Sequence, residues 1–445
     1  MHFIVSIKRS LFNAFVFYKE IEIILWICAI CVVCIIAGMI FYKPYLGVVF
    51  VIVSIPFEGK IDFGCISIYP LEVILAILAL ICIYKSIVGR NNYFGNMKLV
   101  YSCIPFVLCI MLSAMKSIEL SLAVKEIIRW LALFLIYYLT INLINDEKKM
   151  RIILYSIFLT VAMVSVLGII NYLSMGYRAI SFFGNPNPLA GYVNLIIPVL
   201  FGMLMTSVFL WERIMLGVFA VLSIVTWFVS FSRSAWLSLI MTMIFFSFFF
   251  FNKIKRRTVF ISLIIFSMFA VIVLSTNVKN DLMRRSDLQR SLISAGYRVQ
   301  CYPIGFNMVK DDLISGIGIG NYHVLIDNSL IDSGLPLHKY SHVIENHLHS
   351  LYLQLFVETG IMGLSAFVFW LACIVRYLVN SLKSIENPRY YWQFVGLMGG
   401  VIVYLFNNLT DVLMVHGIHL QWGIIIGLAV VLTQFRESDT CPKTV

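Results

Sequence analysis

Polar segments divide the chain into a succession of apolar stretches, each about as long as a membrane-crossing helix. A helix needs about 20 apolar residues to cross the hydrocarbon core of a bilayer. Of the 445 residues, 61% are hydrophobic and 12% are charged, whereas soluble domains carry about 25% charged residues. The sequence therefore excludes a soluble enzyme and a disordered chain, and it predicts an all-α, polytopic membrane bundle of about twelve transmembrane helices. The predicted spans are 22–42, 70–88, 98–115, 121–142, 150–173, 187–208, 213–231, 234–251, 257–275, 352–378, 391–411 and 417–434.

Two further segments near the N-terminus need a separate interpretation. The apolar stretch 45–57 is short and ends after Pro56, so we expect it to be re-entrant or interfacial rather than spanning. The segment before the first span carries Lys8, Arg9 and Lys19 and resembles a signal-anchor flank. It lacks a small-residue cleavage site, so we expect it to be retained.

The distribution of basic residues predicts the orientation of the spans. With a cytoplasmic N-terminus and alternating spans, nineteen basic residues fall on the inner side. The short outer loops hold five, namely Lys43, Lys60, Lys116, Arg178 and Arg233. This bias follows the positive-inside rule. It assigns most of the +11 net charge to cytoplasmic anchors and gives no support to a nucleic-acid partner.

A long polar segment, residues 276–348, is then an extracytoplasmic loop before the last three helices. It carries seven basic and seven acidic residues and four of the eight histidines, His323, His338, His342 and His347. A loop of this length is usually functional. We divide the chain into N-terminal transmembrane helices (1–177), transmembrane helices with two polar motifs (178–275), the extracytoplasmic loop (276–348), and C-terminal helices with a short cytoplasmic tail (349–445).

The cysteines give little information about function. Cys28, Cys31 and Cys34 lie at helical spacing inside the first apolar stretch, where free cysteines act as small hydrophobic side chains. No nearby residue completes a metal or cluster site. Cys65 and Cys301 fall in segments that we expect to be external and could pair, although nothing else in the sequence supports a disulfide.

Two polar motifs flank the sixth, seventh and eighth spans on the outer side. The first, Arg178 to Pro188, contains Asn185 and Asn187 in a repeated Asn-Pro pattern, which either offers side-chain amides to a ligand or only starts a helix. The second, FSRSAW at 231–236, places Arg233 at the outer membrane surface. Arg233 either anchors the chain to lipid phosphate or holds a phosphate or pyrophosphate with its guanidinium fork.

The third motif lies in the long loop and contains Arg298 followed by a glycine run. Gly316, Gly318 and Gly320 imitate a nucleotide-binding pattern, but no strand precedes them and they face outward, so we expect a tight backbone turn instead. Arg284, Arg285 and Arg290 add cationic groups that either bind substrate or form an ordinary solvated surface.

The fourth motif extends from Glu345 into the tenth span and contains His347 and His349. Their spacing meets no zinc pattern. A histidine at the membrane surface with arginines nearby can act as a general base or stabilise an anionic leaving group, and it can also be a structural hydrogen-bonding group.

These four motifs, in this order, resemble the O-antigen ligase and polymerase family of bacterial membrane glycosyltransferases. The matching stretches are GNPNPLAGY at 184–192, SRSAW at 232–236, the stretch from Arg298 to GIGIGN at 316–321, and HSLYLQLFVETGIMGL at 349–364. They span about two fifths of the chain. Family members often have Asn after the histidine, whereas this chain has Ser350, which also donates and accepts hydrogen bonds.

The resemblance implies a twelve-span helical bundle whose large extracytoplasmic loop precedes the last three helices. It also implies transfer of a glycan from an undecaprenyl-pyrophosphate carrier to an acceptor sugar hydroxyl, without a nucleotide sugar, cofactor or required metal. Arg233 and Arg298 would bind the pyrophosphate, and His349 would be the catalytic histidine. Arg178, Asn185, Asn187, Arg284, Arg285, Arg290 and His347 would be further substrate-binding residues. The acceptor would be a glycan, a lipid or a protein, and the site would face outward from the bacterial cytoplasmic membrane.

Three functions follow from the sequence, in order of preference. A ligase would attach a finished polysaccharide to its final acceptor, as in lipopolysaccharide assembly, whereas a polymerase of the same family would extend the chain on its carrier. A transporter or flippase would bury ionisable groups near the midplane and show repeated halves. Lys125, Glu126 and Arg129 are the candidates for such groups, and they could pair within one helix; no repeat is apparent.

Overall fold

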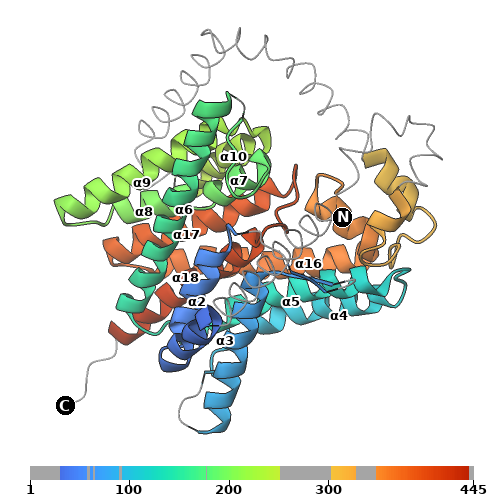
Figure 1. Ribbon diagram of the computed structural model, residues 1–445, viewed down its shortest axis with the longest axis horizontal. Helices are drawn as coiled ribbons and strands as arrows, with labels where there is room; N and C mark the ends of the chain where they lie inside the picture. Colours follow the sequence, from blue (N-terminus) through green and yellow to red (C-terminus); the bar gives the residue numbers. More distant parts are fainter. Residues whose placement is uncertain are drawn as a thin grey trace, which may run out of the picture.

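The computed structural model describes residues 31–57, 61–63, 66–89, 93–176, 178–250, 302–326 and 347–439. It is a bundle of α-helices (Figure 1), which confirms the all-α prediction. The one exception in the described residues is a small antiparallel hairpin of β1 (Ile61–Phe63) and β2 (Ile66–Ile68), in which Ile61 pairs with Ile68. The labelled helices are α2 (Tyr45–Ser54), α3 (Pro70–Ile87), α4 (Val100–Ala114), α5 (Leu120–Leu143), α6 (Glu147–Met175), α7 (Pro186–Asn194), α8 (Ile197–Leu204), α9 (Leu210–Val229), α10 (Arg233–Phe250), α16 (Leu351–Ser384), α17 (Pro388–Asn407) and α18 (Ile418–Asp439).

Six segments of the described chain are long and apolar enough to cross a membrane. They are Pro70–Ile87, Glu147–Met175, Pro186–Leu204, Leu210–Val229, Leu351–Ser384 and Ile418–Phe435. Shorter apolar helices cover Cys31–Tyr42, Tyr45–Ser54, Val100–Ala114 and Arg233–Phe246. The chain is therefore a multi-pass membrane protein. The expected span at 257–275 lies outside the described residues.

Polar side chains at the helix starts fix several of these boundaries. Asp146, Asn185 and Asn387 each accept a hydrogen bond from a backbone N–H of the first turn of α6, α7 and α17. Such caps satisfy N–H groups that have no partner inside the helix. α6 ends at Gly176 in the left-handed conformation that glycine adopts without a steric penalty. Local sequence signals thus set the helix ends, even where the helix body is uniformly apolar.

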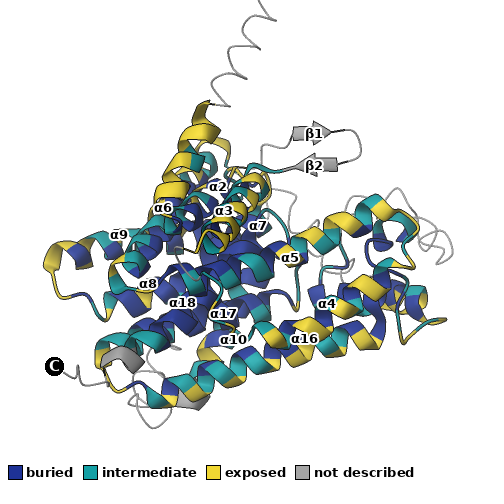
Figure 2. Ribbon diagram, turned by 90° about the horizontal axis from the view of Figure 1, so that it is seen from below, coloured by how far each residue is buried: buried dark blue, intermediate teal, exposed yellow. Residues whose placement is uncertain are grey.

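The centre of the bundle is formed by α17 and α18 with α5, α7 and α8 around them. Figure 2 shows α17 and α18 mostly buried, while α5 and the outer helices also carry exposed residues. α17 crosses α8 at glycines: a Cβ on Gly202 would lie 2.5 Å from the carbonyl oxygen of Trp392, and one on Gly396 would lie 2.7 Å from that of Pro198. Small residues at a crossing let membrane helices approach closely.

The helix α16 bends sharply at Gly360, which divides the predicted span 352–378. Gly360 has φ 64° and ψ −169°, outside the helical region. The rings of Tyr352 and Phe367 lie 6.0 Å apart, whereas a straight helix would separate these two residues by about 22 Å. The chain therefore turns back, and a short first arm, 351–359, packs beside the longer second arm.

Within the segment 45–57, residues Tyr45–Ser54 form the short helix α2, which is not among the six candidate spans. One end of α2 lies by α6, where the Lys149 ammonium is 5.8 Å from the Tyr45 ring centroid. The other end lies by the start of α18, where a Cβ on Gly417 would be 3.4 Å from Ile55. Buried contacts with α3 and α6 hold α2 inside the bundle rather than at its surface.

Lys43 precedes this helix and lies at the end of the bundle that holds Lys85 and Lys149. The Lys85 ammonium is 4.9 Å from the Phe41 ring centroid, which places the turn before α2 beside the last turn of α3. The assignment of Lys43 to the opposite side, with Lys116 and Arg178, was therefore wrong. The reason is that α2 is too short to be recognised as a connection between the two ends.

Candidate active site

Three of the sequence motifs and one further loop come together at one end of the bundle, called here the site end. The start of α7, the turn between α9 and α10, the start of α16 and the loop between α17 and α18 (residues 408–417) meet there. The basic residues Lys85, Lys149 and Arg389 lie at the other end, on the last turn of α3 and the first turns of α6 and α17.

Arg178 joins the first motif to the second. Its Nε donates to the carbonyl oxygen of Ser230 and its Nη2 donates to Oδ1 of Asn187, both over 2.7 Å. Asn185 caps α7 by accepting from the N–H of Asn187 over 2.9 Å. The Asn-Pro repeat therefore starts α7, and its Asn187 also accepts a hydrogen bond from Arg178. Because the Nε and Nη2 donors are engaged by the protein, Arg178 holds the two motifs in place.

Arg233 is the first residue of α10 and is exposed at the site end. The serines on either side of it are buried, and their hydroxyl oxygens lie 3.0 Å apart. The Ser234 hydroxyl also donates to the Asp411 carboxylate over 3.3 Å. A helix N-terminus with an exposed arginine presents N–H groups and a positive charge to an anion.

His349 lies immediately before the first arm of α16 and is half-buried. Ser350 caps this helix by accepting from the N–H of Leu353, a role that Asn performs equally well. The N–H of Leu351 donates to the carbonyl oxygen of Asn408 over 3.0 Å. This bond places His349 beside the loop 408–417, the loop that also carries Asp411.

His347 differs from His349 in its surroundings. Its Nδ1 atom is buried and has no hydrogen-bond partner within the described residues, and its ring lies 5.9 Å from that of His323. Burial, reinforced by the charges of His323, Arg129 and His349, lowers the pKa of His347 to about 3. The His347 ring is therefore neutral at physiological pH.

Strained backbone is concentrated at this end of the protein. Among the described residues, four that are not glycine have positive φ, and three of them are Phe231, His349 and His416, with φ between 50° and 52°. Such conformations cost about 1–3 kcal/mol each and persist where the surrounding structure holds them. The second and fourth motifs and the loop 408–417 each contain one.

The glycine run forms the tight turn that the sequence predicts. Gly316, Gly318 and Gly320 all have positive φ. The N–H groups of Ile317 and Gly318 donate to the carbonyl oxygens of Val357 and Glu358, at 2.9 and 3.0 Å. The turn thus docks on the first arm of α16, just before the bend.

Asn321 completes this docking on its other side. Its Oδ1 accepts from the N–H of Ile118 over 2.8 Å, and its Nδ2 donates to the carbonyl oxygens of Lys116 and Ile317. The side chain is 1% exposed. The glycine motif is therefore a clasp between the α4–α5 turn and α16, close to the site and not itself a nucleotide site.

Asp411 and His416 were missed in the sequence analysis. Both belong to the loop 408–417, and the His416 ring packs edge-on against Phe183, 5.8 Å between centroids. Burial and the nearby Arg129 charge lower the pKa of His416 to about 4. The available signal was the run NNLTD at 407–411, at the end of the predicted span 391–411.

Several predicted residues lie outside the described part of the chain. They are Arg284, Arg285, Arg290 and Arg298, and with them Cys28, Cys65 and Cys301. Cys31 and Cys34 are free thiols on the exposed face of the first described helix. Within the described residues, no group of His, Cys, Asp or Glu side chains has the arrangement of a metal site.

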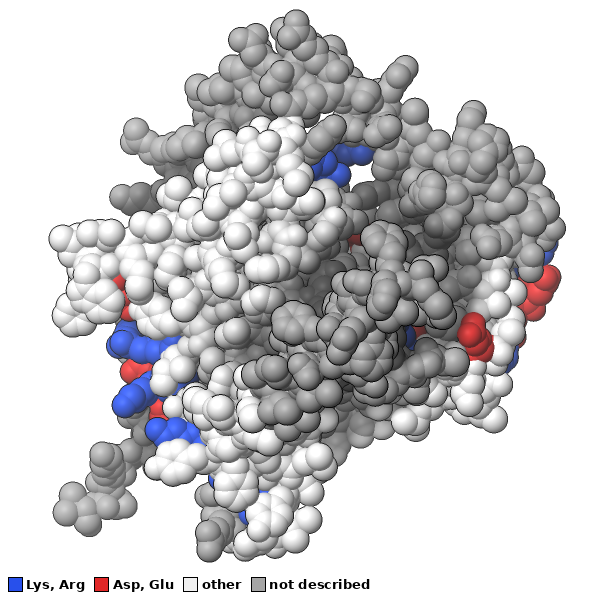
Figure 3. Space-filling model, viewed as in Figure 1, with Lys and Arg blue, Asp and Glu red and all other residues white. Residues whose placement is uncertain are grey.

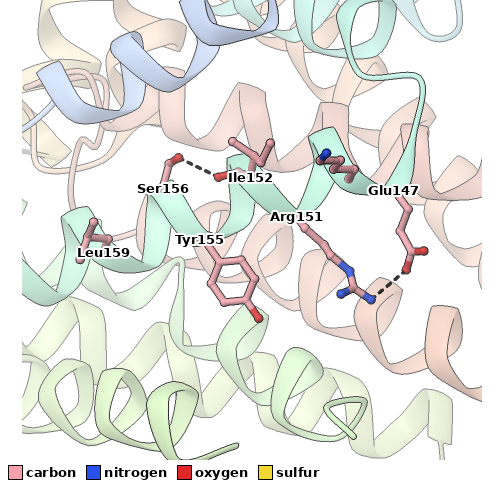
Figure 4. A pocket seen from close by; sticks show the side chains of 7 residues that line it. Glu147, Arg151, Ile152, Tyr155, Ser156 and Leu159 are labelled. Carbon is pink, nitrogen blue, oxygen red and sulfur yellow. Dashed lines mark hydrogen bonds and ion pairs between the residues drawn. The ribbon is translucent and has the colours of Figure 1, made fainter. Parts of the chain in front are cut away.

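A second polar cluster lies at the opposite end, around a shallow groove of about 640 Å³ along the first turns of α6 (Figure 4). Glu147 pairs with Arg151 at 3.4 Å and with Arg389 at 2.9 Å, and the Tyr155 hydroxyl donates to Glu212. Figure 3 shows Lys and Arg side chains gathered, with a few acidic ones, along the left edge of the molecule. The Glu147–Arg389 ion pair joins α6 to α17, and the groove is lined by no predicted site residue.

The fold and the site define a multi-pass membrane protein with a cluster of arginine, histidine, serine and carboxylate groups at one end of its helices. Residues 218–368 match the family model described as O-antigen ligase. Enzymes of this family are polyprenyl-pyrophosphate-dependent glycosyltransferases. The match covers Arg233, the glycine clasp and His349, while Arg178 and the Asn-Pro repeat lie before it. No curated protein matches the chain.

Proposed function

We propose that this protein is a ligase-type glycosyltransferase. It transfers a polysaccharide from undecaprenyl pyrophosphate to a sugar hydroxyl of a glycan, lipid or protein acceptor at the outer face of the cytoplasmic membrane. The observation that supports this proposal most directly is the meeting of the SRSAW motif and His349 at the loop 408–417, through the Ser234–Asp411 and Leu351–Asn408 hydrogen bonds.

The leaving group is a lipid pyrophosphate, and its negative charge grows as the glycosidic bond breaks. Arg233 and Arg298 stabilise this charge, and the N-terminus of α10 adds its backbone N–H groups. Arg178 and Asn187 keep the start of α7 against the α9–α10 turn, so that Arg233 is presented from a rigid support. Asn185, Arg284, Arg285 and Arg290 contribute further polar contacts to the substrate.

His349 accepts the proton of the acceptor hydroxyl as that oxygen attacks the anomeric carbon. The new bond forms between the acceptor oxygen and the sugar, and the electron pair of the broken C–O bond leaves with the pyrophosphate. Histidine is the side chain that most often acts as the general base in such a step. The half-buried His347 lies beside His323 and contributes a neutral ring next to the site. Asp411 stabilises the imidazolium that forms and holds the SRSAW turn.

The topology proposed for this function has about twelve spans, with the site end outward. Lys85, Lys149, Arg151 and Arg389 gather at the opposite end, as the positive-inside rule requires of a cytoplasmic end. In this arrangement residues 276–348 precede the last three helices outside the membrane, and the lipid tail of the donor lies between spans. Labelling of single cysteines placed at residues 151 and 185 tests which end of the bundle faces outward.

Two variants test the chemistry. His349→Ala and Arg233→Ala should each abolish glycan transfer while the protein still inserts in the membrane. Ser350→Asn is the matched control and should retain transfer, because Asn caps α16 as Ser does. Normal transfer by His349→Ala would show that the catalytic assignment is wrong.

A repeat-unit polymerase of the same family is the alternative. The two functions differ in the glycan that remains when the protein is deleted from its host. Loss of attached polymer with accumulation of lipid-linked polymer supports the ligase. Single repeat units that stay unpolymerised support the polymerase. Unchanged surface glycan with altered solute uptake would support a transporter and contradict both.

A further inference from the structure

α5 carries a partly buried ion pair that the proposed chemistry does not use. Arg129 Nη1 and Glu126 Oε1 lie 2.6 Å apart, and the two side chains are 22% and 16% exposed. Arg129 is nine residues after the start of α5, which places it about 13 Å along the helix. Ionisable groups at such depth are costly, and they usually face a polar interior and serve a function.

The packing of α5 against α18 shows which way Arg129 faces. The two helices run parallel: a Cβ on Gly427 would lie 2.6 Å from Thr140, and one on Gly423 would lie 3.0 Å from Leu133. His419 lies four residues before Gly423 on α18, and Arg129 lies four residues before Leu133 on α5. Residues four apart share a helix face, so His419 and Arg129 lie on the two faces that pack together. The charge of Arg129 acts on His347, His416 and His419, which come from three different segments.

This position is level with the candidate active site. The rings of Tyr404 and Trp422 stack at 4.4 Å and align α17 with α18. Asn408, at the end of α17, and His419, at the start of α18, lie one helical turn closer to the site end than Tyr404 and Trp422. Asn408 accepts the hydrogen bond from Leu351 that places His349. Arg129 therefore forms part of the wall that faces His349 and the loop 408–417.

The guanidinium of Arg129 has an edge available for a ligand. Within the described residues its one hydrogen bond runs from Nη1 to Glu126, so the Nη2 side is open. Arg178, by contrast, uses both Nε and Nη2 on protein atoms. Nearby, the Nδ1 atoms of His347 and His419 are buried without partners in the described part of the chain, and His419 is 4% exposed. Buried polar atoms without partners mark a place that a polar occupant fills.

We propose that Arg129 is a further donor-binding residue, whose open guanidinium edge binds an oxyanion of the lipid-linked pyrophosphate beside His347 and His419. This inference rests on the proposed function. Glu126 neutralises Arg129 in the empty protein and lowers the cost of burying its charge. The pyrophosphate competes with Glu126 for the guanidinium and binds it by the bidentate geometry that arginine offers to phosphates.

The test separates donor binding from a structural ion pair through variants of the two partners. The full-length protein is purified in detergent, and its dissociation constant for undecaprenyl pyrophosphate without glycan is measured together with its thermal unfolding. Arg129→Ala should weaken binding about tenfold or more, and Arg129→Lys should restore part of it. Glu126→Gln should tighten binding, since it removes the competing carboxylate. Lys125→Ala, an exposed neighbour on α5, is the control and should change neither quantity.

Two results would overturn the proposal. One is binding of undecaprenyl pyrophosphate by Arg129→Ala with unchanged affinity. The other is equal weakening by Arg129→Ala and Glu126→Gln with matching losses of thermal stability, which would show that the pair is structural. Failure of the proposed function is seen separately, as absence of glycan transfer by a wild-type protein that still binds the pyrophosphate lipid.

Discussion

The hydroxyl of Ser234 donates a hydrogen bond to the carboxylate of Asp411 over 3.3 Å, across 177 residues of sequence. This contact joins the start of α10 to the loop between α17 and α18. The second carboxylate oxygen of Asp411 accepts from the N–H of Val412 over 2.9 Å, so the side chain is fixed on both sides. The loop thereby brings a negative charge next to Arg233 and to the segment that holds His349.

We expect Asp411→Ala to reduce glycan transfer about 100-fold or more, which corresponds to about 2.7 kcal/mol of transition-state stabilisation. In the proposed mechanism the carboxylate both holds the SRSAW turn and stabilises the protonated form of His349. Ser234→Ala removes one neutral donor and should cost no more than about tenfold. Transfer rates of purified variants with a lipid-linked glycan give both values. Glu386→Gln, an exposed carboxylate at the other end of the bundle, is the control.

A second prediction concerns Arg178, which two acceptors hold in place. Arg178→Lys keeps the charge but presents a single ammonium, which cannot reproduce the two separate donors that contact Ser230 and Asn187. We expect Arg178→Lys to lower thermal stability and transfer by nearly as much as Arg178→Ala. Asn187→Ala should show a smaller loss, since Ser230 still accepts. A fully active Arg178→Lys would show that Arg178 acts through its charge alone.

Helix positions were the part of the structure that the sequence predicted well. The apolar stretches 70–88, 121–142 and 213–231 correspond to α3, α5 and α9 within a few residues at each end. Hydropathy and length determine such helices because a bilayer offers the backbone no other way to satisfy its hydrogen bonds. The ion pair of Glu126 with Arg129 was also predicted, because side chains three residues apart share a helix face.

The bend in α16 and the role of Asp411 could not be predicted in the same way. Gly360 lies inside a single predicted span, and nothing in the local sequence shows that the glycine clasp packs against it, where Ile314 and Gly316 lie close to a Cβ built on Gly360. Asp411 looks like an ordinary loop carboxylate in the sequence, since its partner Ser234 is brought to it by the packing of α10 against α17. Both features depend on contacts between distant segments, which hydropathy and local propensity do not contain.

The contact between the glycine clasp and Gly360 gives a stability prediction with two internal controls. A Cβ on Gly360 would lie 2.2 Å from the carbonyl oxygen of Ile314, and φ is 64°. Gly360→Ala should therefore cost more than about 3 kcal/mol. Gly89→Ala tests the backbone strain alone, because φ is 78° but nothing lies within 4 Å, and it should cost about 1 kcal/mol. Gly217→Ala, in open space within α9, should be neutral or slightly stabilising. Thermal unfolding in detergent ranks the three variants.

The last prediction concerns acid. His347 and His416 have pKa values of about 3 and about 4 in the folded protein, below the ordinary value of 6.5. The unfolded chain therefore binds more protons than the folded protein between pH 6.5 and these values. The stability that comes from keeping the rings neutral is fully present above pH 6.5 and is lost as the pH falls.

For each of the two histidines, the free energy of unfolding should fall by about 1.4 kcal/mol for every pH unit below 6.5. Wild-type protein should therefore unfold at a progressively lower temperature at pH 6, 5.5 and 5. His347→Gln and His416→Gln should each reduce this pH dependence, and the double variant should reduce it most. An unfolding temperature of the double variant that falls with pH as steeply as that of the wild type would show that other groups, such as the carboxylates, control the acid response.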